Sequence, residues 1–433
     1  MRVIQLFRHP IIGNTTWLMG GKIFRYAIGA VVTFVVARHL GPKDYGILSY
    51  IVAIVALVQP FATLGLSALL TRQLITKPAV ASRILGTSFW IRTLANVFCL
   101  SLVVLFIAYS KSDEKLLVTG VILLSFGRSL GGFEVIDFYF QSKTEAKFSV
   151  WAQSTAFLII SVIRIGLVVL HCKLFTFLVA QSLELVLEAI FWIWVYRYRS
   201  NRIEFWRFDW KLASELLKKS WPLALAGIAA VITLKIDQVM IGDMLGYQDV
   251  GIYSAASRLS EVWLFVPTAI VASTFPGLLI TWQNDRVKYI DQMHRLFSLL
   301  AYLGITVAIL IQIFANPIIR ILYGPGFHTA APVLVIHIWG AVFIFMRTLV
   351  SKWLVTEELY IFSLVTHSLG AVTNVTLNLW MIPRYGILGA AWATVASYAI
   401  SSYLALWIHP RTREIAILMT RAVFAPKLHN FMP

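Results

Sequence analysis

Residues 40–49 read LGPKDYGILS, and residues 245–254 read LGYQDVGIYS. Six of the ten positions are identical at an offset of 205 residues, and self-similarity at a fixed offset is the signature of an internal repeat. Each copy joins the first and second long apolar stretch of one half of the chain. The sequence therefore predicts two related halves. The copies also suit a tight turn between two helices, and that alternative role does not affect the duplication.

The composition places these halves in a membrane. The 433 residues are 59% hydrophobic and 13% charged, against roughly 25% charged residues in soluble domains. A spanning helix needs about 20 mainly apolar residues. Twelve stretches meet this requirement: 14–37, 45–70, 84–109, 116–140, 148–170, 174–196, 220–245, 250–280, 296–317, 330–351, 359–382 and 387–408.

We therefore expect an all-α polytopic membrane protein with about 12 transmembrane helices. Six helices separate the repeats, so the two six-helix bundles have the same orientation, around a central cavity. Pro60 and Pro267 lie inside the second helix of each bundle and are expected to bend it. The predicted boundaries are 1–197 for the N-terminal bundle, 198–219 for a basic linker, 220–409 for the C-terminal bundle and 410–433 for a tail.

The distribution of the 37 Lys and Arg residues predicts the orientation, because these residues accumulate in cytoplasmic loops. With a cytoplasmic N-terminus, 22 of them lie inside, 7 outside and 8 within spans. Both termini, the linker and the tail are then cytoplasmic. Orientation and contact with anionic headgroups account for the net charge of +17, so no nucleic-acid partner is expected. The first apolar run contains Lys22 and Arg25 and is interpreted as a retained helix, not a cleaved signal peptide.

The cations within spans are the most informative residues, because charges in a bilayer usually face a cavity or a partner. Lys22 and Arg25 share a helix face and have no acid in their helix. Arg258 and Lys235 lie at comparable depth in the second half. These cations favour an anionic substrate such as pyrophosphate. The alternative is that each pairs with an acid. The remaining cations within spans are Arg92, Arg128, Arg164 and Arg347.

Acids and amides within spans suggest two further roles. Asp237, Glu184 and Glu188 are candidates to bind a coupling proton or sodium ion, with plain helix pairing as the alternative. Asn374 and Asn378 lie along one face of a predicted helix and are candidates to contact sugar hydroxyls. Asn also serves helix packing in membranes.

The sequence does not indicate an enzyme. It has no phosphate-cradling Gly-rich loop, no metal-spaced His or Cys set and no nucleotide signature. We therefore expect no metal, no cofactor and no ATP-driven activity by this chain alone. The two cysteines provide no disulfide framework.

Four stretches of the chain are similar to one known family. They are NTTWLMGGKIFRYAIGAVVTFVVARHLGPKDYGILSY at 14–50, KIDQVMIGDMLGYQDVGIYSAASRLSEVWLFVPTAI at 235–270, LYGPGFHTAAPVL at 322–334 and NLWMIPRYGILGAAWATVASY at 378–398. The sequence resembles the polysaccharide biosynthesis flippases, which include O-antigen repeat-unit exporters of the multidrug, oligosaccharidyl-lipid and polysaccharide exporter superfamily.

The resemblance implies a bacterial inner-membrane protein that flips undecaprenyl-pyrophosphate-linked oligosaccharides by alternating access. A related branch holds pyrophosphate with arginines in its first and eighth helices, and Arg25 and Arg258 occupy comparable helices here. That branch usually has fourteen helices, the last two lining a groove for the lipid tail. Twelve are predicted here, so the resemblance does not give the path of the tail.

The expected partners are the lipid-linked glycan, membrane lipid and a glycan polymerase or glycosyltransferases of the same pathway, around a monomeric protein. Two alternatives remain at this point: an ion-coupled multidrug exporter of the same superfamily, which needs a net acidic cavity, and a membrane glycosyltransferase or polymerase. A paired-carboxylate site on an outer loop would favour the latter, and Asp113 with Glu114 is the one such pair. A scaffold without transport activity would leave the intramembrane cations unexplained.

Overall fold

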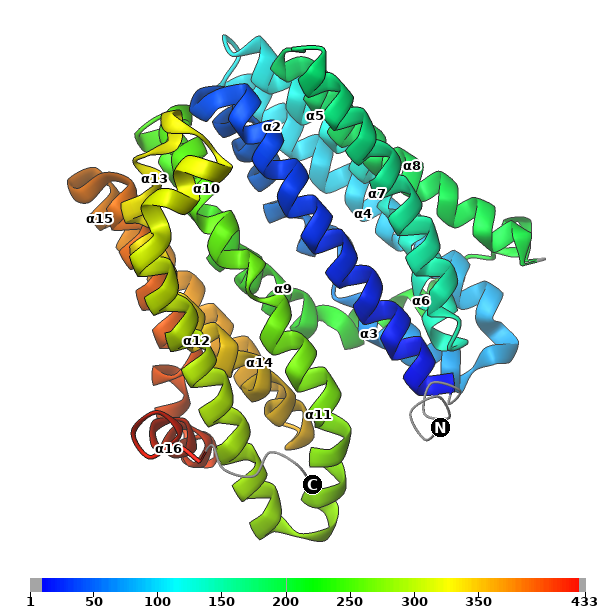
Figure 1. Cartoon of the computed structure of the whole chain (residues 1–433). Helices are drawn as coiled ribbons and strands as arrows, with labels where there is room; N and C mark the ends of the chain where they lie inside the picture. Colours follow the sequence, from blue (N-terminus) through cyan, green and yellow to red (C-terminus); the bar gives the residue numbers. More distant parts are fainter. Residues whose placement is uncertain (1–9, 200, 428–433) are drawn as a thin grey trace, which may run out of the picture. The chain divides into compact units, whose positions relative to one another are not determined.

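The computed structural model describes residues 10–199 and 201–427. Arg2 and Arg8, which entered the orientation argument, lie outside these residues. The first half contains α2 (Pro10–Thr63), α3 (Leu66–Thr76), α4 (Ala81–Ser110), α5 (Lys115–Ser129), α6 (Val135–Ser142), α7 (Ala146–Val169) and α8 (Leu174–Tyr198). The second half contains α10 (Tyr247–Val262), α11 (Phe265–Asn284), α12 (Arg286–Leu322), α13 (Ala330–His337), α14 (Gly340–Thr356), α15 (Tyr360–Ser402) and α16 (Pro410–Phe424). In the chain, the long helix α9 (Trp210–Met244) follows the first set and precedes the second. Figure 1 labels these helices.

The helices in the described residues account for the predicted spans. Nine of them are long and apolar enough to cross a membrane, and the bent pair α13 and α14 forms one more span. Two of the nine each contain two predicted spans, because α2 leaves helical geometry at Gly41 and α15 does so at Gly386. With each kink taken as the boundary of two spans, the segments correspond to the twelve apolar stretches. Helices suit this environment because they satisfy every backbone polar group internally.

The two sequence repeats contact each other through their glycines. Gly41 and Gly246, at equivalent positions, have φ values of 74° and 104°, which glycine adopts without steric strain. A Cβ atom added at Gly46 would lie 1.7 Å from the carbonyl oxygen of Tyr247, and one added at Gly251 would lie 1.9 Å from that of Pro42. The first glycine of each copy thus permits the turn, and the second permits close backbone contact with the other copy.

The second helix of each half is interrupted near its proline, as predicted. Helix α2 ends three residues after Pro60, and Leu64 and Gly65 have positive φ values before α3 begins. In the second half the chain breaks between α10 and α11, and Pro267 lies in the first turn of α11, where its missing N–H is tolerated. Both halves therefore divide this span into two helical segments.

The chain separates into two compact units. One comprises residues 1–40 and 47–228, and the other comprises residues 41–46 and 229–433. The first unit, called the N-terminal half below, has α7 and α8 side by side (Figure 1). Its largest core cluster includes Leu66, Ile136 and Trp192. The second unit, the C-terminal half below, packs α12 against α14 and α16.

The basic linker is fixed to the N-terminal half. The Arg207 N–H donates to the Ser82 carbonyl oxygen at 3.4 Å, and the Asp209 N–H donates to Thr87 Oγ1 at 3.0 Å. A Cβ atom added at Gly86 would lie 2.6 Å from the Arg207 backbone. The linker is thus packed on the start of α4, unlike a freely solvated segment.

The tail forms α16, which packs on α12. Thr412, Ile415, Ala416, Met419 and Ala422 form its buried face. Beyond the helix, Lys427 Nζ lies 2.6 Å from Asp291 Oδ1. The described part of the tail is therefore ordered against the C-terminal half.

Candidate functional site

A polar cavity of about 700 Å³ lies within the N-terminal half. Its lining combines three cations, four carboxylic acids, amides and aromatic rings. The residues are Lys22, Arg25, Tyr26, Arg128, Glu134, Asp137, Phe138, Gln141, Ser149, Val150, Gln153, Ala156, Phe157, Glu184 and Glu188.

Helical spacing directs these side chains into one space. Lys22 and Arg25 lie three residues apart on α2, while Glu184 and Glu188 lie four apart on α8. Residues at these spacings share a helix face. Asp137 and Gln141 on α6, and Ser149 and Gln153 on α7, have the same spacing of four. Each helix therefore presents a polar pair in an otherwise apolar span.

The cations of this cavity have no acid bound to them. Arg25 donates a hydrogen bond from Nη1 to Gln153 Oε1. Among the described residues, Lys22 and Arg128 make no hydrogen bond or ion pair with protein. A membrane-embedded cation without a counter-charge is unfavourable unless water or an anion receives it. Four carboxylic acids line the same cavity, but none of them forms a hydrogen bond or ion pair with these three cations in the described residues.

The predicted ion-coupling acids of α8 differ from each other. Arg164 Nη2 lies 2.6 Å from Glu184 Oε2 and also donates to Gln181 Oε1 at 2.8 Å. Glu184 of α8 therefore pairs with Arg164 of α7. Such pairing between helices was the alternative to an ion-coupling role. Glu188 makes no hydrogen bond or ion pair in the described residues and lines the cavity.

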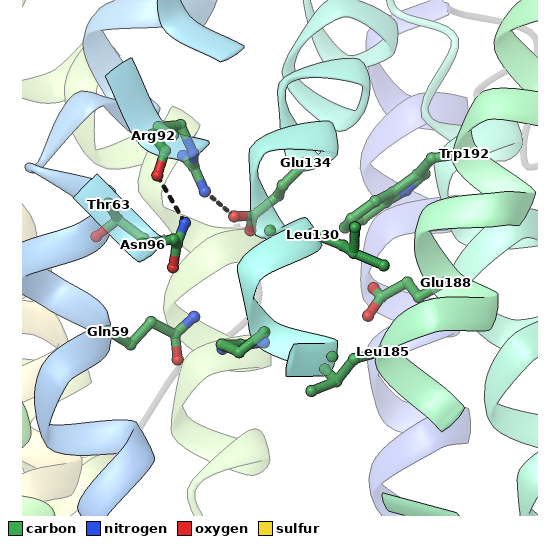
Figure 2. Close-up of a pocket in the computed structure, with 12 residues that line it drawn as sticks. Gln59, Thr63, Arg92, Asn96, Leu130, Glu134, Leu185, Glu188 and Trp192 are labelled. Atoms are coloured by element: carbon green, nitrogen blue, oxygen red, sulfur yellow. Dashed lines mark hydrogen bonds and ion pairs between the residues drawn. The ribbon is translucent and has the colours of Figure 1, made fainter. Parts of the chain in front are cut away.

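A second, smaller cavity of about 90 Å³ adjoins the same helices. Figure 2 shows Arg92 of α4 pointing to Glu134, and Glu188 of α8 on the other side of the space. Arg92 Nη2 donates to Glu134 Oε2, and Asn96 Nδ2 donates to the Arg92 carbonyl oxygen at 2.9 Å. Glu134 closes a 3₁₀ segment that interrupts the span between α5 and α6. Arg92 is thereby paired inside the protein.

In the C-terminal half, the candidate ion-coupling acid is enclosed by protein. Asp237 of α9 is 2% exposed. Its Oδ2 accepts from the Tyr253 hydroxyl at 2.6 Å and from Thr394 Oγ1, and its Oδ1 accepts from Asn378 Nδ2 at 2.6 Å. Asn378 also donates to Asn374 Oδ1 at 3.1 Å. All the donors to this carboxylate are neutral.

Asn374 and Asn378 are therefore enclosed by protein in this structure. Both have 0% exposure, and Asn374 Nδ2 lies 3.4 Å from Ser397 Oγ. The predicted contact with sugar hydroxyls needs an accessible amide. Their positions instead support a role in holding Asp237.

The other two predicted cations of the C-terminal half have different surroundings. Lys235 Nζ lies 3.6 Å from Glu261 Oε1, so it is paired. Arg258 is exposed and makes no hydrogen bond or ion pair in the described residues. Arg258 therefore pairs with neither Glu261 nor Asp237 in this structure.

A buried arginine in the same half has a structural role. Arg347 is 5% exposed and donates to the Ser401 carbonyl oxygen at 2.9 Å and to Thr366 Oγ1 at 2.8 Å. Ser401 lies at the C-terminal end of α15, where carbonyl groups lack helical partners. Arg347 thus satisfies that helix end.

Sorted in this way, the intramembrane cations form two groups. Arg92, Arg164, Lys235 and Arg347 bind a protein acid or carbonyl oxygen. In the described residues, Lys22, Arg128 and Arg258 bind neither, and Arg25 binds only the side-chain amide oxygen of Gln153.

Sequence reasoning left several residues of these sites unassigned. Asp137, Ser149 and Gln153 were not identified as cavity residues, although each belongs to an i, i+4 polar pair. Tyr253 and Thr394 were not identified as partners of Asp237, because no local sequence pattern marks these contacts. Thr394 lies 157 positions from Asp237 in the chain. Among the described residues, no three His, Cys, Asp or Glu side chains are arranged to hold a metal ion.

Curated relatives match part of the chain. A probable flippase, AglR, from Haloferax volcanii is 28% identical over 182 residues, which are 41% of this chain and 38% of that protein. A probable low-salt glycan biosynthesis flippase, Agl15, from the same organism is 25% identical over 39% of this chain and 36% of its own length. The matched stretches thus span less than half of each relative.

Solved structures match nearly the whole chain. The lipid II flippase MurJ in an inward closed conformation has a TM-score of 0.73 at 14% identity, covering 94% of this chain and 90% of that one. An inward-facing multidrug resistance MATE family transporter of the MOP superfamily has a TM-score of 0.71 at 14% identity, covering 92% and 96%. These likenesses show the fold and confirm the prediction of an all-helical membrane protein of this architecture.

The family assignment rests on a family model. The model described as "Polysaccharide biosynthesis protein" matches residues 11–282, which is more than half of the chain. This confirms the resemblance seen in the sequence. The chain is a multi-pass membrane protein that belongs to the polysaccharide biosynthesis protein family.

Proposed function

We propose that this protein is a flippase that moves a polyprenyl-pyrophosphate-linked oligosaccharide across the membrane by alternating access. The observation that carries the proposal is the cavity in the N-terminal half, where Lys22, Arg25 and Arg128 lack an acidic partner. Relatives named as probable flippases support it. Such a substrate supplies the missing counter-charge.

Pyrophosphate suits these cations chemically. A guanidinium group donates parallel hydrogen bonds to phosphate oxygens, and an ammonium group adds a compact charge. Arg25 and Lys22 share one helix face and therefore address the same volume. Arg258, which also lacks a partner in the described residues, is proposed as a further substrate-binding cation. Lys235 is a weaker candidate to bind the substrate, because it already pairs with Glu261.

The alternatives fit less well. A cation-drug exporter needs a net acidic cavity. Two of the acids here, Glu134 and Glu184, are neutralised by Arg92 and Arg164, which do not themselves line the cavity. A glycosyltransferase needs a placed carboxylate pair. Glu114 of the one outer candidate pair lies 3.9 Å from Lys111, which supports neutralisation on a turn.

The coupling cation is proposed to bind at Asp237. A negative charge on a buried carboxylate is costly when all its donors are neutral, and a bound proton or sodium ion neutralises that charge. Asn378 Oδ1 is buried, has no hydrogen-bond partner and offers a further oxygen. Glu188 remains a second candidate, and Glu184 a weaker one because of Arg164.

The location and orientation are also proposals. The charge distribution supports an orientation with both termini cytoplasmic. The bacterial inner membrane, a monomeric state and a place beside the polymerase or glycosyltransferases of the pathway are proposed from the family resemblance alone. Cysteine substitutions at Ser112 and Glu204, probed with an impermeant thiol reagent in intact cells, test the orientation. We expect labelling at 112 only, and labelling at 204 only would contradict it.

The substrate proposal is tested with Arg25→Ala, Arg25→Lys, Arg258→Ala and Arg258→Lys in a flipping or complementation assay at matched membrane levels. Each charge-assisted bond contributes about 1.5 to 3 kcal/mol, so each Ala variant should lose roughly tenfold to a hundredfold in substrate affinity. Each Lys variant should recover part of it, because charge returns without the bidentate fork. Full activity in both Ala variants would overturn the proposal.

The coupling proposal is tested by Asp237→Asn and Glu188→Gln. The variant at the true coupling site should lose gradient-dependent transport while substrate binding is unchanged. Unaltered gradient dependence in both variants would remove both candidates.

A further inference from the structure

The tail helix α16 presents one face that the described residues do not cover. It lies beside α12 (Figure 1), and its buried face packs there. The opposite face exposes Arg413, Ile417, Arg421 and Phe424, at spacings of four, four and three residues. Residues at these spacings share one helix face. We call these four residues the tail stripe.

The tail stripe combines apolar and basic side chains. Ile417 is 40% exposed and Phe424 is 83% exposed. At about 100° per residue around the helix axis, these two side chains lie between Arg413 and Arg421. An apolar centre flanked by arginines is typical of helices that lie in the plane of a membrane interface. The tail stripe therefore has the pattern of a lipid-binding helix face.

The arginines of the tail stripe are available to a ligand. The Arg421 side chain makes no hydrogen bond or ion pair in the described residues. Arg413 donates only from Nε, to the Trp407 carbonyl oxygen at 2.9 Å. Glu414, the one acid of α16, has Arg286 Nη2 at 3.5 Å. The tail stripe is therefore positively charged and complements an anionic surface.

Contacts with α12 place α16 at the edge of the membrane. The predicted span in α12 begins at residue 296. Arg286, ten residues before this boundary, pairs with Glu414. Tyr302, six residues beyond it, donates from its hydroxyl to the Val423 carbonyl oxygen at 3.1 Å. Helix α16 therefore lies across the level where headgroups meet acyl chains.

The tail stripe also continues a surface that lipid covers. The predicted span in the second part of α15 ends at residue 408, directly before α16. Trp407 is 38% exposed and Ile408 is 62% exposed, and tryptophan is enriched where a span meets the membrane interface. Apolar side chains are thus exposed continuously from the end of this span to the tail stripe.

We propose that the tail stripe binds anionic lipid in the leaflet that surrounds this end of the bundle. Ile417 and Phe424 insert among the acyl chains beneath the headgroups. Arg413 and Arg421 bind the headgroup phosphates through charge-assisted hydrogen bonds. This inference goes beyond the proposed function, because the ligand is lipid of the bilayer and not the transported molecule.

Quenching by spin-labelled lipid tests the depth of the tail stripe. Cys99→Ser/Cys172→Ser provides a background without native cysteines, and a fluorophore is attached to Phe424→Cys or Val287→Cys of the full chain in nanodiscs. The two positions are matched, because Phe424 is 83% and Val287 82% exposed. Lipid labelled near the headgroup should quench the fluorophore at 424 at least about threefold more than the one at 287. Equal quenching at both positions would overturn the inference.

The charge of the lipid tests the arginines. Spin-labelled phosphatidylglycerol should quench the fluorophore at 424 about threefold more than spin-labelled phosphatidylcholine, because cations near the membrane surface attract anionic lipid. Arg413→Gln/Arg421→Gln should remove this preference. Arg197→Gln/Arg202→Gln removes the same charge from the N-terminal half and should retain it. Equal quenching by the two lipids, or equal effects of the two double variants, would overturn the inference.

A single variant decides the outcome where the double variant fails to fold. Arg421→Gln removes no side-chain contact with the described protein, so it should lose part of the preference for phosphatidylglycerol with an unchanged melting midpoint. A full preference in this variant would exclude Arg421 from the lipid site. These measurements involve no transport, so failure of the proposed function leaves their interpretation unaffected.

Discussion

The two halves share a repeated segment, yet their candidate site residues have different surroundings. The N-terminal half directs Lys22, Arg25 and Arg128 into a cavity, where none of them forms an ion pair with an acid in the described residues. The C-terminal half surrounds Asp237 with protein donors and excludes solvent from it. We propose that the open cations of the N-terminal half bind the substrate headgroup and that the enclosed carboxylate of the C-terminal half binds a small ion.

The largest expected effect concerns the closed network of the C-terminal half. Asp237→Ala leaves the Tyr253, Thr394 and Asn378 donors without their shared acceptor, and we expect a loss of about 3 to 5 kcal/mol in the free energy of unfolding. Asp237→Asn retains an acceptor and should lose much less. Thermal melting of both variants in detergent measures this. An unchanged midpoint for Asp237→Ala would show that the network does not stabilise this half.

The contact between the repeats gives the next largest effect. Gly46→Ala and Gly251→Ala each place a methyl group against a carbonyl oxygen of the other copy, and we expect each to lose about 2 to 3 kcal/mol. Similar losses should occur because the contacts are equivalent. Gly166→Ala is the control, since no neighbouring atom lies within 4 Å of the added Cβ. Melting midpoints equal to that of the control would contradict the packing.

A cation of the open cavity should affect transport more than stability. Arg128 lacks a protein partner, so Arg128→Ala should lower flipping roughly tenfold while the melting midpoint stays close to that of the native protein. Arg347 provides the contrast, because Arg347→Ala removes bonds to Ser401 and Thr366 and should mainly destabilise. Equal changes in flipping and in melting midpoint for the two variants would contradict the difference between the halves.

The smallest effect is expected for Glu184. Its pairing with Arg164 is partly exposed, so Glu184→Gln should change the free energy of unfolding by about 1 kcal/mol and leave gradient dependence unaltered. Transport measured with and without a gradient checks this. Loss of gradient dependence would return Glu184 to the coupling site.

The sequence was sufficient for the architecture because its signals are local or periodic. Apolar length predicted the spans, and Pro60 and Pro267 predicted the interrupted helices. Pairing was not predictable in the same way. Asp237 and Thr394 meet over a separation of 157 residues, and whether Arg92 or Arg25 has an acidic partner depends on which neighbouring helix face it meets. The sequence therefore located the charged residues but did not predict which of them have a partner in the protein.

The most direct test compares an unpaired pair of cations with a paired one in the same half. Lys22→Ala/Arg25→Ala removes two cations from the cavity, while Arg164→Gln/Glu184→Gln removes a cation together with its partner. Flipping of a polyprenyl-pyrophosphate-linked glycan is measured in proteoliposomes at equal protein density. We expect the first double variant to lose at least roughly tenfold in rate and the second to stay within about twofold of the native protein. Equal rates in the two variants would contradict the assignment of the open cavity to the substrate.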